Sequence, residues 1–160
     1  MSETADRGVI RSRNPATGEV KGEVEAATPE EVEEAVESAR AAQRPWSSRS
    51  VEERLEVLDV FQNHLIRRRE EVARTISAET GKPVGEGLVT DVIPVVDAVR
   101  FLREKGPEVL ESDLNLGNLM VMDRESKIVR EPVGVIGMIT PWNYPLGIPG
   151  SQVVYALFAG

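Results

Sequence analysis

Apolar residues recur at helical spacing from residue 28 onward, and the pattern opens with a helix-start signal. Thr28 suits the N-cap, Pro29 suits the first helical position, and Glu31 lies three residues after the cap. The residues that follow place apolar side chains on one face, at Val32, Ala35, Val36, Ala39 and Ala42. The pattern therefore predicts a helix that ends at Pro45, because proline interrupts helical hydrogen bonding.

A second and longer helix is predicted after Ser50, which is again followed three residues later by a glutamate, Glu53. Its broad apolar face consists of Leu55, Leu58, Phe61, Leu65, Val72 and Ile76. Gly81 and then Pro83 form a typical helix end. We therefore expect one continuous helix from residue 51 to about residue 80.

A third helical stretch is predicted over residues 87–104. Its apolar face consists of Val89, Val92, Val96, Val99 and Leu102. We expect Pro94 to bend this helix, since it lies inside the pattern, and we expect Gly106 and Pro107 to end it.

Strand-like patterns flank these helices. Short apolar runs on either side of the turn at residues 14–19 predict a hairpin, and those around residues 123–126 predict a second. The run at residues 133–139 has the apolar character of a buried strand, and residues 148–158 predict a buried helix. A parallel strand needs a partner strand that we do not find, so we expect the last helix to leave apolar surface uncovered.

Composition narrows the possible functions. The formal net charge is −8, so binding to nucleic acid or to an anionic membrane is not expected. The sequence contains no cysteine, which excludes a thiolate nucleophile within these residues, and we expect no metal site. The polar first residues lack the apolar core of a secretory signal, and no apolar run has the length of a membrane span. A cytoplasmic protein is the resulting expectation.

Four motifs follow one another along the chain. They are Asn-Pro-Ala-Thr-Gly-Glu at residues 14–19, Glu-Thr-Gly-Lys-Pro at 79–83, Glu-Pro-Val-Gly-Val-Ile-Gly at 131–137 and Thr-Pro-Trp-Asn-Tyr-Pro-Leu at 140–146. In this order and spacing they resemble the aldehyde dehydrogenase superfamily. The most specific of them is the Pro-Trp-Asn-Tyr-Pro loop after a strand rich in valine and glycine.

This resemblance implies an α/β protein, of which the chain is the N-terminal part of a three-domain fold. We expect a flexible tail at residues 1–12 and the helical part of a cofactor-binding domain at 13–117. An oligomerisation hairpin is expected at 118–131, and the first, incomplete βα unit of a Rossmann-like domain at 132–160. From the residues alone, the alternative for the second hairpin is an intramolecular hairpin on the domain surface.

The resemblance also implies the activity, which is the NAD- or NADP-dependent oxidation of an aldehyde to a carboxylic acid. Asn143 matches the asparagine whose side-chain amide donates to the oxyanion that forms on the aldehyde. Ile139, Thr140, Pro141 and Trp142 match the segment that lies along the cofactor, and Tyr144 matches an aromatic position beside the aldehyde's entry path. Without the resemblance, Trp142 and Tyr144 suit ordinary packing under a loop, and Asn143 suits a turn.

In relatives, the catalytic cysteine, the glutamate base and the second strand of the cofactor domain follow the region that ends at residue 160. We therefore expect the full protein to be a homodimer or homotetramer that acts on a small aldehyde, and this chain alone to be inactive. The alternative is a short, non-catalytic interaction module derived from the same fold. The only histidine, His64, suits a solvated or half-buried position on a helix, and Lys82 suits a cation at a helix end.

Overall fold

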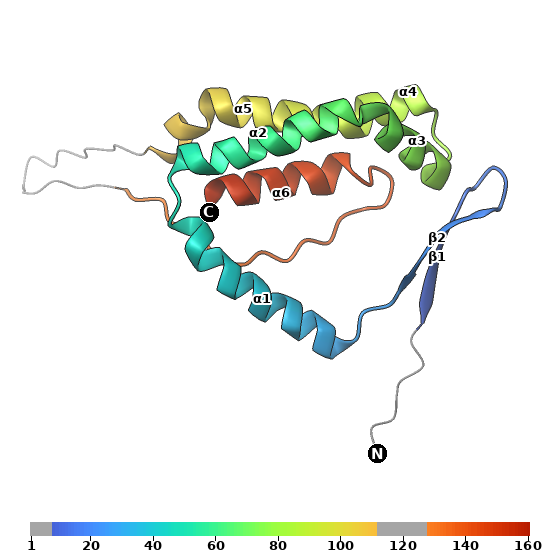
Figure 1. Ribbon diagram of the computed structural model, residues 1–160, viewed down its shortest axis with the longest axis horizontal. Coiled ribbons are helices and arrows are strands. Elements are labelled where there is room, and N and C mark those ends of the chain that lie inside the picture. Colours follow the sequence, from blue (N-terminus) through green and yellow to red (C-terminus); the bar gives the residue numbers. More distant parts are fainter. Residues whose placement is uncertain (1–7, 112–127) are drawn as a thin grey trace, which may run out of the picture.

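The structure is a computed structural model that describes residues 8–111 and 128–160. Most of the expected hairpin at residues 118–131 lies outside the described residues, and the part inside them, 128–131, contains no strand. The described residues are mostly helical, with a two-stranded hairpin at the N-terminal side (Figure 1). Among the residues described, no helix is both long and apolar enough to cross a membrane.

The N-terminal hairpin is confirmed. Strand β1 (Val9–Arg13) pairs antiparallel with β2 (Val20–Glu25), and Val9 lies opposite Glu25. The turn between them is held by Asn14, whose side-chain oxygen accepts from the backbone N–H of Ala16 at 2.8 Å. Residues 9–12, which are predicted to lie in the flexible tail, therefore belong to a strand.

Both predicted helix starts are confirmed. Helix α1 (Pro29–Ser47) begins with a capping box between Thr28 and Glu31, and α2 (Val51–Arg67) begins with one between Ser50 and Glu53. The predicted end of α1 is wrong, because the helix continues through Pro45. Proline leaves the carbonyl of the residue four positions earlier without its helical donor, but Ala41 is exposed and water can bind there.

The predicted helix over residues 51–80 is two helices. Helix α2 ends at Arg67, and α3 (Arg69–Thr80) begins two residues later, with Arg68 in a non-helical conformation between them. No glycine or proline marks this break in the sequence. The predicted end is confirmed, because α3 ends at Gly81, whose φ of 78° lies in the left-handed region.

The third predicted helix differs from the expectation in its centre. A short helix α4 (Val84–Gly87) leads into a π-helical turn, η1 (Leu88–Val92), which continues as α5 (Ile93–Leu110). Pro94 lies at the start of α5, directly after the wider π turn, and Pro107 lies inside α5 instead of ending it. Most of the predicted apolar face is buried, but Val89 is exposed, and Asp91 and Val95, which lie outside that face, are fully buried.

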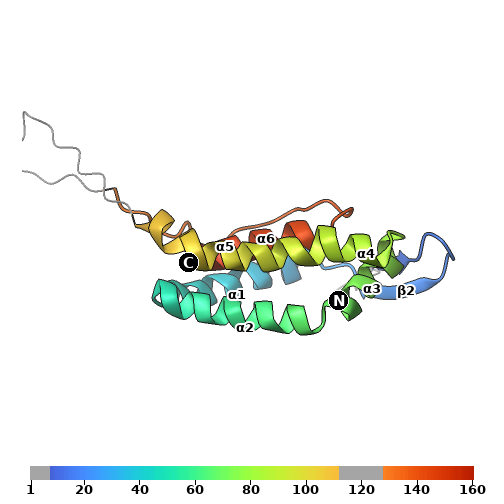
Figure 2. The same ribbon diagram turned by 90° about the horizontal axis from the view of Figure 1, so that it is seen from above.

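The hydrophobic core lies between α2, α5 and α6 (Gly147–Ala159). Helices α2 and α5 lie side by side, and α6 packs beneath both of them (Figures 1 and 2). The buried side chains that join the three helices are Leu55, Leu58, Leu65, Val95, Ala98, Val99, Leu102, Val154 and Phe158. Helix α1 leaves this bundle at an angle (Figure 1). It contacts the C-terminal part of α6, where the Trp46 indole N–H donates to the carbonyl of Leu157 at 2.8 Å.

The predicted buried strand at residues 133–139 does not form among the described residues. The segment is irregular, and Val133 and Ile139 are almost fully exposed. A strand is defined by hydrogen bonds to a neighbouring strand, and the only sheet in the described part of the chain is the β1–β2 hairpin. The predicted C-terminal helix is confirmed as α6, and so is its uncovered apolar surface at Val153, Tyr155 and Leu157.

Gly81 offers a direct test of the local structure at the end of α3. A side chain there would be strained by the positive φ, and its Cβ would lie 2.6 Å from Cγ of Pro15 in the hairpin turn. We expect Gly81→Ala to lower the free energy of unfolding by about 1–2 kcal/mol, measured by urea denaturation. The control is Gly85→Ala in α4, where a Cβ meets no atom within 4 Å, and which we expect to leave stability unchanged or higher. Equal changes in the free energy of unfolding for the two substitutions would contradict the strained position of a side chain at residue 81.

Candidate functional site

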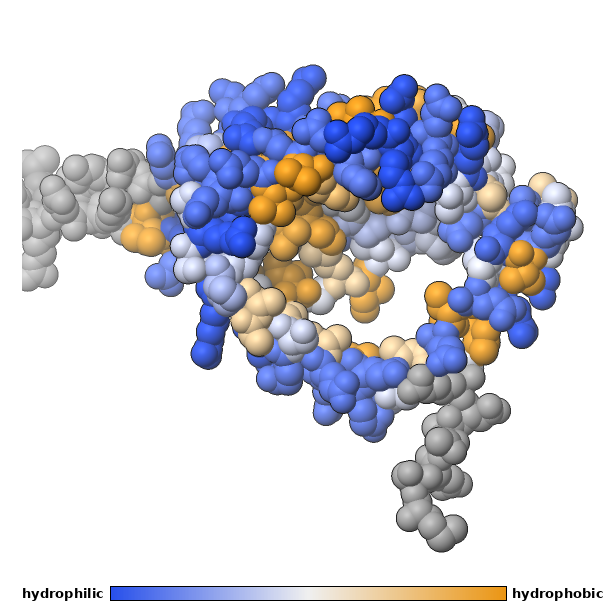
Figure 3. Space-filling view, viewed as in Figure 1, coloured by the Kyte–Doolittle hydropathy of each residue, from blue (hydrophilic) through white to orange (hydrophobic). Residues whose placement is uncertain are grey.

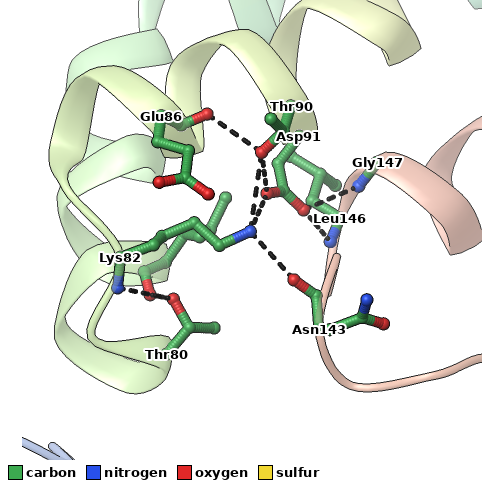
Figure 4. Close-up of polar contacts among 9 residues, drawn as sticks. Thr80, Lys82, Glu86, Thr90, Asp91, Asn143, Leu146 and Gly147 are labelled. Carbon is green, nitrogen blue, oxygen red and sulfur yellow. Dashed lines mark hydrogen bonds and ion pairs between the residues drawn. The ribbon is translucent and has the colours of Figure 1, made fainter.

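Two segments far apart in sequence meet at the N-terminal end of α6. One is the Glu-Thr-Gly-Lys-Pro motif together with η1, and the other is the loop that leads into α6 (Figure 4). The first segment contains an ion pair, in which Nζ of Lys82 lies 2.8 Å from Oδ2 of Asp91, and both of these side chains bond to the backbone of the second segment. The Lys82 side chain is 10% exposed and the Asp91 side chain 0%, so the pair is shielded from water.

Asp91 holds the start of α6 with its other oxygen. Oδ1 accepts from the backbone N–H groups of Leu146 and Gly147, each at 3.1 Å. These are donors that a helix leaves unsatisfied at its N-terminus, where a negative charge also interacts favourably with the helix dipole. The contact is close because Gly147 has no side chain: a Cβ there would lie 2.5 Å from the carbonyl oxygen of Thr90.

The surroundings of Asp91 change its pKa in opposite directions. Burial raises the pKa of the carboxyl, because the charged form loses its hydration. Hydrogen bonds from Lys82, Gly147, Leu146 and Thr90 stabilise the charged form, and together they hold the pKa of Asp91 below its ordinary value. Asp91 is therefore a carboxylate at neutral pH.

Lys82 connects the same ion pair to the loop. Its Nζ donates to the backbone carbonyl of Asn143 at 2.9 Å and lies 4.5 Å from the centre of the Tyr144 ring, in cation–π geometry. Figure 4 shows the Asn143 carbonyl facing Lys82 and the Asn143 side-chain amide pointing away from the pair. The backbone of Asn143 is thus held, while its amide stays available for another partner.

The residues predicted to bind cofactor and substrate lie on this loop, but only Asn143 and Tyr144 contact the ion pair. Ile139 is fully exposed and Trp142 is 81% exposed; Pro141 is also exposed, and Thr140 is half-buried. Exposed apolar side chains beside a hydroxyl can contact a flat ring such as a nicotinamide. Among the residues described, no group of acidic or histidine side chains could hold a metal ion.

An apolar cleft of about 390 Å³ lies elsewhere, between α1, α6 and residues 134–138. Ala39, Trp46, Ile136, Val153 and Leu157 are among its lining residues. Figure 3 shows apolar residues gathered around the hollow between α1 and α6. None of residues 139–144 lines this cleft, so it does not coincide with the predicted cofactor segment.

Two charged residues of the site, Lys82 and Asp91, are not among the site residues predicted from the sequence. The sequence pattern predicts Lys82 only as a cation at a helix end. A signal was present, because Asp91 is the single charged residue in the otherwise uncharged stretch 87–96, and a charge on a buried face needs a partner. His64, in contrast, lies exposed on α2, in keeping with the solvated position predicted for it.

The charge on Asp91 predicts a pH-dependent contribution to stability. Because the folded pKa is lower than the unfolded pKa, this contribution is complete above about pH 4 and disappears as the pH falls through the folded pKa. At pH 7 we expect the free energy of unfolding of Asp91→Asn to be about 3 kcal/mol lower than that of the wild type. Below about pH 4 this difference should shrink.

Urea denaturation at a series of pH values measures this difference. The control is Glu37→Gln, which removes the partner of Arg40 in an exposed pair and which we expect to change stability little at any pH. A difference between wild type and Asp91→Asn that stayed constant from neutral to strongly acid pH would show that the Asp91 carboxylate does not have this role.

Comparison with known proteins gives a consistent result over the whole chain. The model of the aldehyde dehydrogenase family matches residues 2–160. The mitochondrial succinate-semialdehyde dehydrogenase of Arabidopsis thaliana is 34% identical over 155 residues, which cover 97% of this chain and 29% of that protein.

Two solved structures have the same arrangement of elements. A Sinorhizobium meliloti protein complexed with NAD is 30% identical with a TM-score of 0.85, covering 100% of this chain and 32% of that one. The NADP-dependent glyceraldehyde-3-phosphate dehydrogenase of Bacillus halodurans, complexed with NADP, is 27% identical with a TM-score of 0.83, covering 96% and 32%. The chain thus spans roughly a third or less of the length of the relatives that it matches.

Proposed function

This chain belongs to the aldehyde dehydrogenase family, and we propose that it forms part of an enzyme that oxidises an aldehyde to a carboxylic acid with NAD or NADP. In this proposal the chain supplies the oxyanion donor and one wall of the cofactor site. The nucleophile comes from outside these residues, because the sequence contains no cysteine. The complete enzyme is proposed to be a cytoplasmic homodimer or homotetramer.

The observation that carries the proposal is that the backbone of Asn143 is held in place while its side-chain amide is exposed. Its backbone carbonyl accepts from Lys82, whereas its side-chain amide points away from the ion pair and is exposed. A donor that stabilises a developing oxyanion has to be fixed before the reaction and free of other partners. An amide also suits this role because it is neutral and does not change the protonation of a neighbouring nucleophile.

The cofactor segment supports the proposal through its exposed chemistry. When bound, the nicotinamide group accepts a hydride from the aldehyde carbon. The exposed side chains of Ile139 and Trp142 offer apolar contacts to such a ring, and Thr140 offers a hydroxyl. Tyr144 lies on the other side of Asn143 in sequence, which suits a contact with the aldehyde's organic group.

Replacing Asn143 tests the proposed oxyanion role. In the complete protein that contains this chain, we expect Asn143→Ala to lower kcat about 100- to 1,000-fold, because one donor to the transition state is lost. KM for the aldehyde should change much less, and the readout is formation of NADH or NADPH by absorbance. Asn63→Ala, at an exposed position of α2, is the matched control and should retain wild-type kcat. Wild-type kcat in the Asn143→Ala variant would refute the oxyanion role.

A second experiment tests the assignment of the nucleophile. We expect these 160 residues alone, mixed with an aldehyde and NAD or NADP, to produce no reduced cofactor, because they include no cysteine. The same absorbance assay measures this, with an aldehyde dehydrogenase of known activity as the positive control. Turnover by the isolated chain would mean that another group acts as the nucleophile.

A further inference from the structure

The side chains of the Lys82–Asp91 ion pair form hydrogen bonds with both ends of the five-residue segment from Asn143 to Gly147. At one end Lys82 donates to the carbonyl of Asn143, and at the other Asp91 accepts from Leu146 and Gly147. The two charged residues contact each other at 2.8 Å. Every one of these contacts therefore depends on a single charge pair.

The pair is itself held in place by the helices that carry it. Lys82 follows Gly81 at the end of α3, and its backbone N–H lies 3.4 Å from the Thr80 hydroxyl. Asp91 lies in η1, where the π turn brings Thr90 and Asp91 toward the start of α6. The Thr90 hydroxyl also lies 2.9 Å from the carbonyl oxygen of Glu86. The pair is thus a rigid link between the helical bundle and the loop.

Stability alone does not account for a pair of this kind. Removing two charges from water costs a large desolvation free energy, and apolar residues of the same size often stabilise a fold as well or better. What an ammonium and a carboxylate provide is direction, since each of their hydrogen bonds fixes the position of a particular backbone atom. Three backbone groups of the loop and of α6 are fixed in this way.

We infer that Lys82 and Asp91 are positioning residues that hold the Asn143 backbone, so that the side-chain amide of Asn143 lies where the oxyanion forms. The inference rests on the proposed function for its catalytic part. Lys82 acts through Asn143 and does not contact the substrate. Its contact with the Tyr144 ring holds the residue after Asn143 in the same way.

A double-mutant cycle in the complete protein tests this coupling. We expect Lys82→Met to lower kcat at least about tenfold in the wild-type background, whereas any change in KM through the lost Tyr144 contact should be the same in both backgrounds. In the Asn143→Ala background the same substitution should lower kcat less than about twofold, because the amide that Lys82 positions is already gone. An equal loss in both backgrounds would overturn the inference and leave Lys82 with a purely structural role.

A second readout does not depend on activity. The backbone N–H of Ile148 donates to the carbonyl of Tyr144 at 3.4 Å, and neither group bonds to Lys82 or Asp91. We expect Lys82→Met to speed hydrogen exchange at Ile148 about fivefold or more, while circular dichroism stays that of the wild type. Unchanged exchange at Ile148 in the folded variant would overturn the inference even if the protein proves to be an active enzyme.

Two further variants complete the design. Arg103→Met in α5 removes an ion pair with Asp59 of α2, away from the loop, and should change neither kcat nor exchange at Ile148. If Lys82→Met does not fold, Lys82→Arg carries the test, because it keeps the charge but changes the hydrogen-bond geometry. We expect Lys82→Arg to fold, to lower kcat and to speed exchange at Ile148; wild-type values for both would overturn the inference. Failure of the proposed function gives a different result. In that case the complete wild-type protein does not oxidise aldehydes, but Lys82→Met still speeds hydrogen exchange at Ile148.

Discussion

The buried pair of Lys82 and Asp91 is the interaction on which the arrangement of the candidate site depends. It joins the end of α3, the π turn and the start of α6 in one set of hydrogen bonds. An unpaired charge at either position would be very unfavourable, because both side chains are shielded from water. The position of the loop therefore depends on the bundle, because the backbone of Asn143 is bonded to the end of α3 and the start of α6 is bonded to η1.

The π turn gives the bundle its particular geometry. It adds one residue to the helical path at Leu88–Val92, where Val89 is exposed and Asp91 is buried. The same turn brings the carboxylate of Asp91 to the N-terminus of α6. The close approach of α6 also requires Gly147, where a Cβ would meet the carbonyl of Thr90. Core packing and site geometry thus depend on the same few residues.

Part of the candidate site could be predicted from the sequence, and part could not. The loop with Asn143 was identified through its motif, and its turn residues and prolines explain why it leaves the helical pattern. The contact between Lys82 and Asn143 could not be predicted, since 61 residues separate them and no local rule relates such positions. The strand expected at residues 133–139 does not form, because a strand needs a neighbouring strand and the described part of the chain supplies none there.

The sequence by itself determined the features that depend on neighbouring residues. These are the capping boxes at Thr28 and Ser50, the left-handed glycine at Gly81 and the hairpin turn at Asn14. Each is decided by hydrogen bonds or sterics within a few residues. The tertiary structure alone decided the break at Arg68, the continuation of two helices through proline and the burial of Asp91 against Lys82. Those features depend on packing and solvent exposure, which are set by residues far away along the chain.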